Sequence, residues 1–198
     1  DMQVHGPVDF ELTSTGNYGI CPCRLLLPSG VVYAFDAGSR RVGLHLGAAF
    51  GSSKLWRPDA CGRLAGRLAR VGLRPVLLGT AEDAPIAELV AAAAGGPVAS
   101  LVGRDRPELL PALLSRLRCL VSGDTGVAHL AAAVGVATVT LFGPTDRRLT
   151  APRGAGARVV DRGVPCAPCF LSSCPIDHSC LGRSEADEVF DEVERALA

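Results

Sequence analysis

The segment from Ser122 to His129, Ser-Gly-Asp-Thr-Gly-Val-Ala-His, holds the residue types best suited to bind a phosphorylated ligand. It follows the apolar run 119–121 and opens a stretch with helical periodicity. Free N–H groups at the start of a helix attract anions. Thr125 adds a hydroxyl, and Gly126 lets a phosphate approach. Asp124 repels phosphate but suits a sugar hydroxyl, so the segment predicts a site for a sugar diphosphate.

The same segment has two alternative interpretations. Asp-Thr-Gly is also the triplet of aspartic proteases, but that fold is all-β, whereas here the triplet precedes a helix. The other alternative is structural: Asp124 caps the helix, and His129 is a core histidine. His129 lies one turn into the predicted helix, on a similar side to Thr125.

A second candidate loop, residues 47–58 with the sequence GAAFGSSKLWRP, contains Lys54, the one lysine among 20 basic residues. An ammonium group is a compact point charge that can sit on a phosphate where a planar guanidinium does not fit. The glycines and serines around it, Ser53 included, suit a phosphate cradle, although the GxxxxGK[ST] spacing of a Walker loop is absent. The alternative is that Lys54 is retained by chance on a solvated loop.

Hydrophobic periodicity predicts that strands and helices alternate from residue 41 onward. The predicted strands are 42–46, 76–78, 98–102, 119–122, 137–142 and 158–160. The predicted helices are 59–71, 84–94, 107–117 and 126–134, and a capping box at Ser184 and Asp187 opens a last helix to Ala198. This order predicts an α/β fold, a Rossmann-like parallel sheet with helices on both faces. Ligands bind beyond the carboxyl ends of such strands, where both candidate loops begin.

Composition excludes several classes of function. The chain has 20 basic and 20 acidic residues in 198, which argues against a general nucleic-acid binder or a polybasic membrane anchor. Aromatic residues make up only 5%, too few for a base-stacking surface. The sequence contains no run of 18 apolar residues, so it predicts no transmembrane segment, and residues 1–10 lack the pattern of a signal peptide. We therefore expect a cytoplasmic protein.

Eight cysteines fall into three groups. Cys61 and Cys119 sit in apolar periodic stretches and are expected in the core, whereas the Cys21-Pro22-Cys23 pair is too tight for two ordinary structural ligands. The remaining four lie within 15 residues at the spacing of metal ligands: Cys166, Cys169, Cys174 and Cys180. Structural zinc, with His178 able to replace one thiol, is one interpretation. Free or disulfide-paired thiols and an iron–sulfur cluster are the alternatives.

Together these motifs resemble glycosyltransferase family 9, the ADP-heptose:lipopolysaccharide heptosyltransferases. The matching segments are GAAFGSSKLWRP, VLLGTAED (76–83), SGDTGVAHLAAAVGVATVTLFGPTD (122–146) and the cysteine-rich stretch with its closing helix. The resemblance covers residues 41–198 and implies the C-terminal, donor-binding domain of a GT-B glycosyltransferase. It implies transfer of heptose from ADP-heptose to the lipopolysaccharide inner core without a metal. The acceptor would be a lipid-anchored saccharide at the inner face of the inner membrane.

The resemblance also implies a role for each residue of the donor site. Lys54, beside Ser53, would bind the diphosphate, and Asp124 would hold hydroxyls of the donor sugar. Thr125 and Gly126 would contact the phosphates. His129 would support the loop or contact a phosphate. Glu82 or Asp83 would bind the ribose hydroxyls, and Asp105 would lie beside the adenine.

Residues 1–40 form an irregular segment that the motifs do not match to the family; short extended stretches such as 31–35 predict one or two short strands. In the family, a preceding domain holds the acceptor and the carboxylate proposed as general base. No catalytic base can therefore be named in this chain. The alternatives to an active transferase are a nucleotide-sugar-binding module, or a half-enzyme that works with a separate acceptor-domain chain.

Overall fold

The structure is a computed structural model that describes residues 23–26, 32–35, 40–104 and 106–198. The chain divides into two compact units, Asp1–Ser39 and Arg40–Ala198. In the first unit, β1 (Cys23–Leu26) pairs with the antiparallel strand β2 (Val32–Phe35), which overlaps the extended stretch expected at 31–35.

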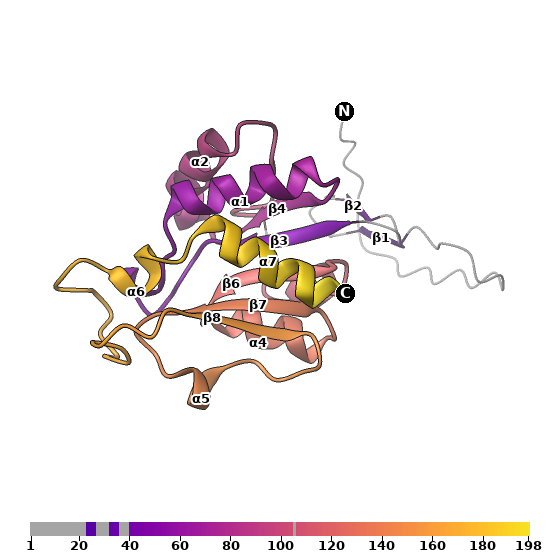
Figure 1. Cartoon of the computed structure of the whole chain (residues 1–198). Coiled ribbons are helices and arrows are strands. Elements are labelled where there is room, and N and C mark those ends of the chain that lie inside the picture. Colours follow the sequence, from indigo (N-terminus) through magenta and orange to yellow (C-terminus); the bar gives the residue numbers. More distant parts are fainter. Residues whose placement is uncertain (1–22, 27–31, 36–39, 105) are drawn as a thin grey trace. The chain divides into compact units, whose positions relative to one another are not determined.

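The second unit is built on a six-stranded sheet in which every pair of neighbouring strands is parallel (Figure 1). The strands are β3 (Arg41–His45), β4 (Arg74–Leu78), β5 (Ala99–Ser100), β6 (Cys119–Gly123), β7 (Ala137–Phe142) and β8 (Ala157–Asp161), in the order β5-β4-β3-β6-β7-β8. The chain moves outward from β3 and then returns to β6 beside it. The strand order therefore reverses between β3 and β6, the point at which sheets of this kind bind ligands.

Helices cover both faces of this sheet, as the alternation of elements predicted. One face carries α1 (Pro58–Arg70), α2 (Ala84–Ala93) and α7 (Ala186–Leu197), while α4 (Gly126–Ala133) packs on the other face with α3 (Leu110–Leu114) against it. Short helices follow several strands: η1 (Ser52–Lys54), η2 (Ala81–Asp83), α5 (Arg147–Thr150) and α6 (Ser179–Gly182). None of the helices in the described part of the chain combines the length and apolar character that a membrane crossing needs.

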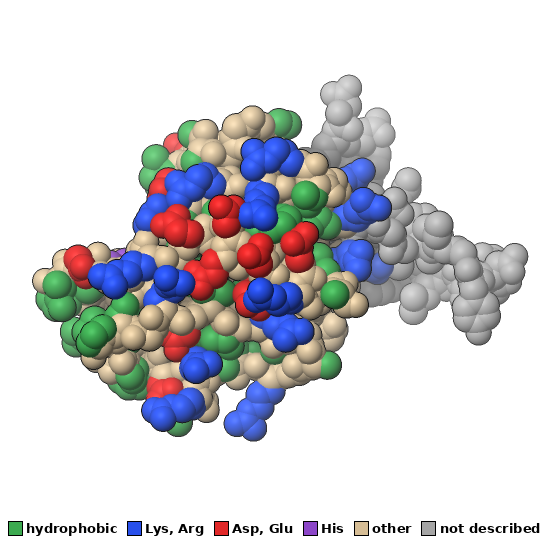
Figure 2. Space-filling view, in the orientation of Figure 1, with side chains coloured by type: hydrophobic (Ala, Val, Ile, Leu, Met, Phe, Trp, Pro, Cys, Tyr) green, Lys and Arg blue, Asp and Glu red, His purple; other side chains and the backbone are tan. Residues whose placement is uncertain are grey.

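The core lies between the sheet and the α1–α7 layer. Leu64 and Leu68 of α1 and Phe190 of α7 face Leu44 and Val121 of the central strands, all of them buried. Burial of each such side chain contributes about 1.5–3 kcal/mol. The outer surface of the same layer mixes acidic and basic side chains (Figure 2), so this face shows no basic patch for nucleic acid. Arg67 pairs there with Asp187, which joins α1 to α7.

Two elements are clearly shorter than predicted. The helix expected over 107–117 is only Leu110–Leu114, and it begins late because Pro111 has no N–H to donate to residue 107. The edge strand expected over 98–102 is reduced to Ala99–Ser100, although Leu101 N still donates to Leu77 O. The strand ends predicted elsewhere agree with the structure within two residues.

The predicted capping box at Ser184 is wrong. The last helix begins at Ala186 with Glu185 as its N-cap residue, and no side chain caps it. The Ser184 hydroxyl is buried without a partner, whereas its carbonyl accepts a hydrogen bond from Trp56 Nε1 at 2.9 Å. Tertiary contacts have therefore displaced Ser184 from the N-cap position and moved the start of the helix one residue on.

We predict that Gly62→Ala destabilises the protein, although alanine favours a helix by roughly 0.5–1 kcal/mol. A Cβ at Gly62 would lie 2.6 Å from the carbonyl oxygen of Val90, because α1 and α2 pack closely there. The expected loss is about 1–3 kcal/mol in the free energy of unfolding, measured by urea titration. Gly96→Ala is the control, because a Cβ at Gly96 would meet nothing within 4 Å. Equal stability of the two variants would contradict the close packing.

Candidate functional site

Lys54 and Asp124 meet at the reversal point of the sheet. Lys54 ends η1, which lies in the loop after β3, and Asp124 follows β6 directly. The Lys54 ammonium donates to the Asp124 Oδ2 atom at 2.9 Å and to the Asp124 carbonyl at 2.8 Å. Both side chains are nearly buried, with 11% and 6% of their areas exposed. Two of the three N–H donors of Lys54 are thus used on Asp124, which fixes the direction of the third.

Asp124 collects further partners from the loop after β7. Its Oδ2 atom also accepts hydrogen bonds from Thr145 Oγ1 at 2.7 Å and Thr150 Oγ1 at 3.2 Å. Its other oxygen, Oδ1, lies 4.0 Å from His129 Nε2. Neither Thr145 nor Thr150 was predicted as a site residue, although Thr145 lies within the matching segment 122–146. Because Lys54, Thr145 and Thr150 all bond to Oδ2, the Oδ1 atom is the carboxylate oxygen of Asp124 that is left to accept further hydrogen bonds.

A pocket of about 300 Å³ opens beside this pair. Its walls come from the Lys54 loop, the start of α4 and the end of α5, and the lining residues are Ala49, Phe50, Lys54, Asp124, Thr125, Gly126, His129 and Thr150. Five of these were predicted as donor contacts. Gly126 is exposed at the first position of α4, and a Cβ there would meet no protein atom within 4 Å. The amide of Ala128 in that first turn donates to Thr125 O at 3.1 Å. The amides of Gly126 and Val127 precede the first intrahelical donor, and an anion can approach them through the open space at Gly126.

Phe50 completes one wall of the pocket. Its ring lies 4.8 Å from the Lys54 ammonium, at the distance of a cation–π contact. Phe50 was not predicted as a site residue, because the sequence around an aromatic residue in a glycine-rich loop does not indicate which residues its ring contacts. The contact leaves Lys54 between the aromatic ring and Asp124.

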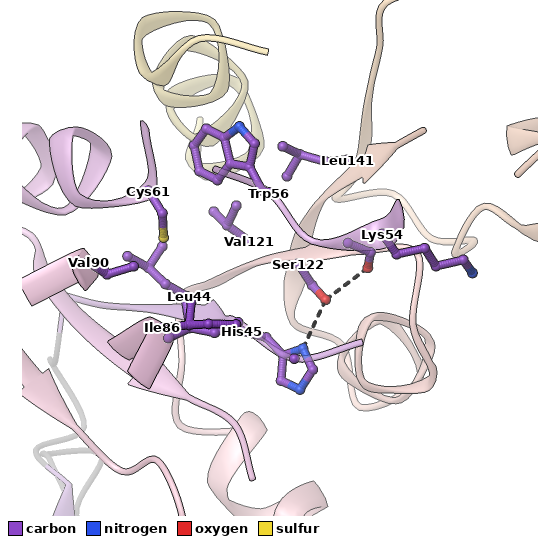
Figure 3. Close-up of a pocket in the computed structure, with 13 residues that line it drawn as sticks. Leu44, His45, Lys54, Trp56, Cys61, Ile86, Val90, Val121, Ser122 and Leu141 are labelled. Carbon is purple, nitrogen blue, oxygen red and sulfur yellow. Dashed lines mark hydrogen bonds between the residues drawn. The ribbon is translucent and has the colours of Figure 1, made fainter. Parts of the chain in front are cut away.

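A small second cavity of about 20 Å³ lies under the loops, at the carboxyl ends of β3 and β6 (Figure 3). His45 borders it and Lys54 extends away from it. His45 Nδ1 is 3.5 Å from Ser122 Oγ, which donates to Gly123 O at 2.9 Å and lies 3.0 Å from Thr125 Oγ1. Because the one proton of Ser122 goes to Gly123, its oxygen is left to accept from Thr125 and His45. This series of hydrogen bonds links His45 of β3 to Thr125, the N-cap residue of α4.

We predict that His45 makes stability fall at mildly acidic pH. Burial lowers the pKa of His45 below 6.5, and the negative charge of Asp83 offsets only part of this effect. Below pH 6.5 the His45 ring is therefore protonated more readily in the unfolded chain than in the folded chain. The free energy of unfolding consequently decreases as pH falls. His45→Gln removes this loss. Urea unfolding at pH 7.5 and 5.5 should show a smaller pH effect in the variant, and equal effects would contradict the assignment.

The structure places the other predicted donor residues differently. Ser53 is only 2% exposed, and its hydroxyl donates to Leu171 O at 2.6 Å, so it offers no group to a ligand. Asp83 is buried at the start of α2 and accepts hydrogen bonds from the amide and hydroxyl of Thr80. Glu82 is exposed and thus better placed of the two to meet a ribose. Asp105 lies outside the described residues.

The purely structural interpretation of the Asp124 loop is wrong. Thr125, not Asp124, is the N-cap residue of α4, and no side chain caps that helix. His129 is not a core residue, because 47% of its side chain is exposed. The alternative that Lys54 lies on a solvated loop fails for the same kind of reason, since its side chain is mostly buried against Asp124.

The cysteine-rich segment, residues 166–180, forms a loop before and into α6. Burial, with the neighbouring thiols acting in the same direction, raises the pKa of Cys180. Within residues 40–104 and 106–198, however, no three histidine, cysteine or acidic side chains are arranged to hold a metal ion. The side chains as placed therefore do not form a zinc site. The zinc hypothesis remains a prediction that elemental analysis of the purified chain would decide.

We predict a sharp division in thiol reactivity. Burial raises the pKa of Cys61 and Cys119 to about 12, so neither forms a thiolate near neutral pH. Cys166 and Cys169 are exposed. Brief treatment of the native, reduced chain with iodoacetamide, followed by peptide mass spectrometry, should label the exposed pair and spare the buried one. Labelling of Cys61 before unfolding would contradict its place in the core.

Comparison with known structures identifies the class of protein to which this fold belongs. The fold matches the E. coli ADP-heptose lipopolysaccharide heptosyltransferase II structure with a TM-score of 0.68 and 27% identity, over 79% of this chain and 46% of that one. It matches the E. coli heptosyltransferase WaaC solved with ADP with a TM-score of 0.61 and 25% identity, over 78% and 44%. The domain is therefore a Rossmann-like domain of the GT-B type of glycosyltransferase, as predicted.

The sequence gives the family. Residues 30–179 match glycosyltransferase family 9 (heptosyltransferase), and the chain belongs to that family. Lipooligosaccharide heptosyltransferase 2 of Campylobacter jejuni is 26% identical over 81% of this chain. Lipopolysaccharide heptosyltransferase 2 of Salmonella typhimurium is 31% identical over 64%. The chain spans about half (52%) of the Campylobacter relative and 38% of the Salmonella one.

Proposed function

We propose that the pocket beside Lys54 and Asp124 binds the diphosphate of a nucleotide sugar, and that this chain supplies the donor half of a heptosyltransferase. The reaction would transfer heptose from ADP-heptose to the lipopolysaccharide inner core. The observation that carries the proposal is the one buried ammonium held beside the open start of α4, at the reversal point of the sheet. A structural neighbour of 26% identity is an E. coli heptosyltransferase solved with ADP-2-deoxy-2-fluoro heptose, which supports a donor of this class.

The reaction would be an inverting displacement at the anomeric carbon. An acceptor hydroxyl attacks as the bond to ADP breaks, and negative charge collects on the departing diphosphate. The free N–H of Lys54 and the first amides of α4 would stabilise that charge, so the transfer itself needs no metal. We assign no general base to this chain, and in the proposed reaction a separate acceptor domain would supply it.

The other residues of the pocket take supporting roles in this proposal. Thr125 and Gly126 would contact the phosphates, and His129, exposed at the rim, would contact a phosphate or steady the loop. Asp124 would receive sugar hydroxyls on Oδ1, because Oδ2 already accepts three hydrogen bonds. Glu82 would hold the ribose. The acceptor would be a lipid-anchored saccharide, which would bring the enzyme to the inner membrane as a peripheral, cytoplasmic protein.

A second candidate function is a nucleotide-sugar-binding module without activity of its own. It is favoured by one observation: Asp124 is the acidic residue that lines the pocket, and its Oδ2 is already bonded to Lys54 and two threonines, so the described residues that line the pocket offer no unengaged carboxylate as a general base. Release of ADP from ADP-heptose, with or without an acceptor, by the purified chain would exclude this alternative.

We predict that the full chain binds ADP and that Lys54→Ala weakens the binding. Hydrogen bonds to charged groups contribute about 1.5–3 kcal/mol, so the expected increase in Kd, measured by calorimetry, is about 10- to 100-fold. Arg153→Ala is the matched control, because it removes the same charge from an exposed position outside the pocket. Binding that is lost equally in both variants would point to net charge alone. Binding unaffected by Lys54→Ala would refute the site.

A further inference from the structure

The cysteine-rich segment is bonded to the Lys54 loop through a single residue, Ser53. Its amide donates to Ser172 O at 3.0 Å, and its hydroxyl donates to Leu171 O at 2.6 Å. Its carbonyl lies 2.6 Å from His178 Nε2. Every polar group of Ser53 is thus engaged by this one segment, and the next residue in the chain is Lys54. These bonds explain why Ser53 is buried although it lies in a surface loop.

The Lys54 loop and the cysteine-rich segment approach each other closely at Gly51. Its φ of 139° is unfavourable for residues with a side chain. A Cβ at this position would lie 2.3 Å from Ser172 O. The loop can therefore meet the cysteine-rich segment only with glycine here.

The same segment is also attached to the other half of the site. The amide of Phe170 donates to Pro144 O at 2.7 Å, and Pro144 precedes Thr145, which donates to Asp124. The segment therefore contacts the chain one residue before Lys54 and one residue before Thr145. It connects the loop that carries Lys54 with the loop after β7, whose Thr145 donates to Asp124.

His178 is the side chain that makes this connection. Because a carbonyl oxygen can only accept, Nε2 carries the proton and donates it to Ser53. The backbone of His178 is left-handed, with φ 55° and ψ 30°, an uncommon conformation for a residue other than glycine. Its amide donates to Cys174 Sγ at 3.3 Å and its carbonyl accepts from Gly182 N at 2.8 Å. The residue is thus fixed from three sides with its ring against the Lys54 loop.

We propose that His178 is a positioning residue for the donor site, acting through Ser53 to hold the Lys54 ammonium against Asp124. The cysteine-rich segment is then the support that sets the phosphate-binding lysine, and not a separate module. The inference rests on the proposed function, because it assigns Lys54 to the donor phosphate. Its effect on Lys54 itself can be measured without any ligand.

The first test measures Lys54 directly. Lys54 is the one side-chain amine of the chain, so its rate of acetylation by acetic anhydride follows from peptide mass spectrometry. We expect His178→Ala to raise that rate several-fold in the full chain, because the ammonium loses its fixed place. His178→Gln, whose amide can still donate, should restore a rate near that of the wild type. Ile176→Ala, at a position 73% exposed in the same segment, is the control. An unchanged rate in His178→Ala would overturn the proposal.

The second test measures ADP binding by calorimetry in a double-mutant cycle. We expect His178→Ala to raise the Kd about tenfold in the wild-type background and to have no further effect in the Lys54→Ala background. An equal loss in both backgrounds would overturn the proposal, because His178 would then act through general structure. If the wild-type chain does not bind ADP, the proposed function fails, and the acetylation rates alone decide the role of His178.

Discussion

The site depends on one buried ion pair, Lys54 with Asp124. Removing two charges from water costs several kcal/mol each, and the cost is recovered only when the remaining hydrogen-bonding groups are satisfied. Here Thr145 and Thr150 donate hydrogen bonds to the carboxylate, and the Asp124 carbonyl accepts a second hydrogen bond from the lysine. Three loops, after β3, β6 and β7, are therefore held together by the requirements of one pair.

This arrangement changes the role expected for Asp124. A carboxylate beside a phosphate site is puzzling as a ligand-binding group alone, because like charges repel. With Oδ2 bonded to the lysine and two threonines, much of its charge is already balanced within the protein. The pocket then presents an oriented N–H of Lys54, the open first turn of α4 and the exposed ring of His129. In the proposed function, a diphosphate would therefore meet hydrogen-bond donors there before it meets a free negative charge.

Sequence patterns predicted the sheet and the central residues of the site, and each miss has a physical reason. The strands β4 and β6 contain the continuous apolar runs 75–78 and 119–121, and the glycines that follow them are visible without tertiary information. Lys54 and Asp124 stood out by residue type. Thr145, Thr150 and Phe50 did not, because a hydroxyl or a ring has no local signal of a partner many residues away. Ser53 and Ser184 were misassigned for the same reason: contacts with distant segments decide the direction of Ser53's hydroxyl and the start of α7.

The separation of the pair along the chain bears on how the domain folds. Lys54 and Asp124 are 70 residues apart, and β3 and β6, which carry them, become neighbours only after two strands and their helices have been passed. Contacts of such long range close large loops and form slowly compared with local helices. A chain emerging from the ribosome can build β3, α1 and β4 early, yet it has no Lys54–Asp124 pair until β6 and the β7 loop are added. Assembly of the pocket is therefore a late event in folding, set by topology.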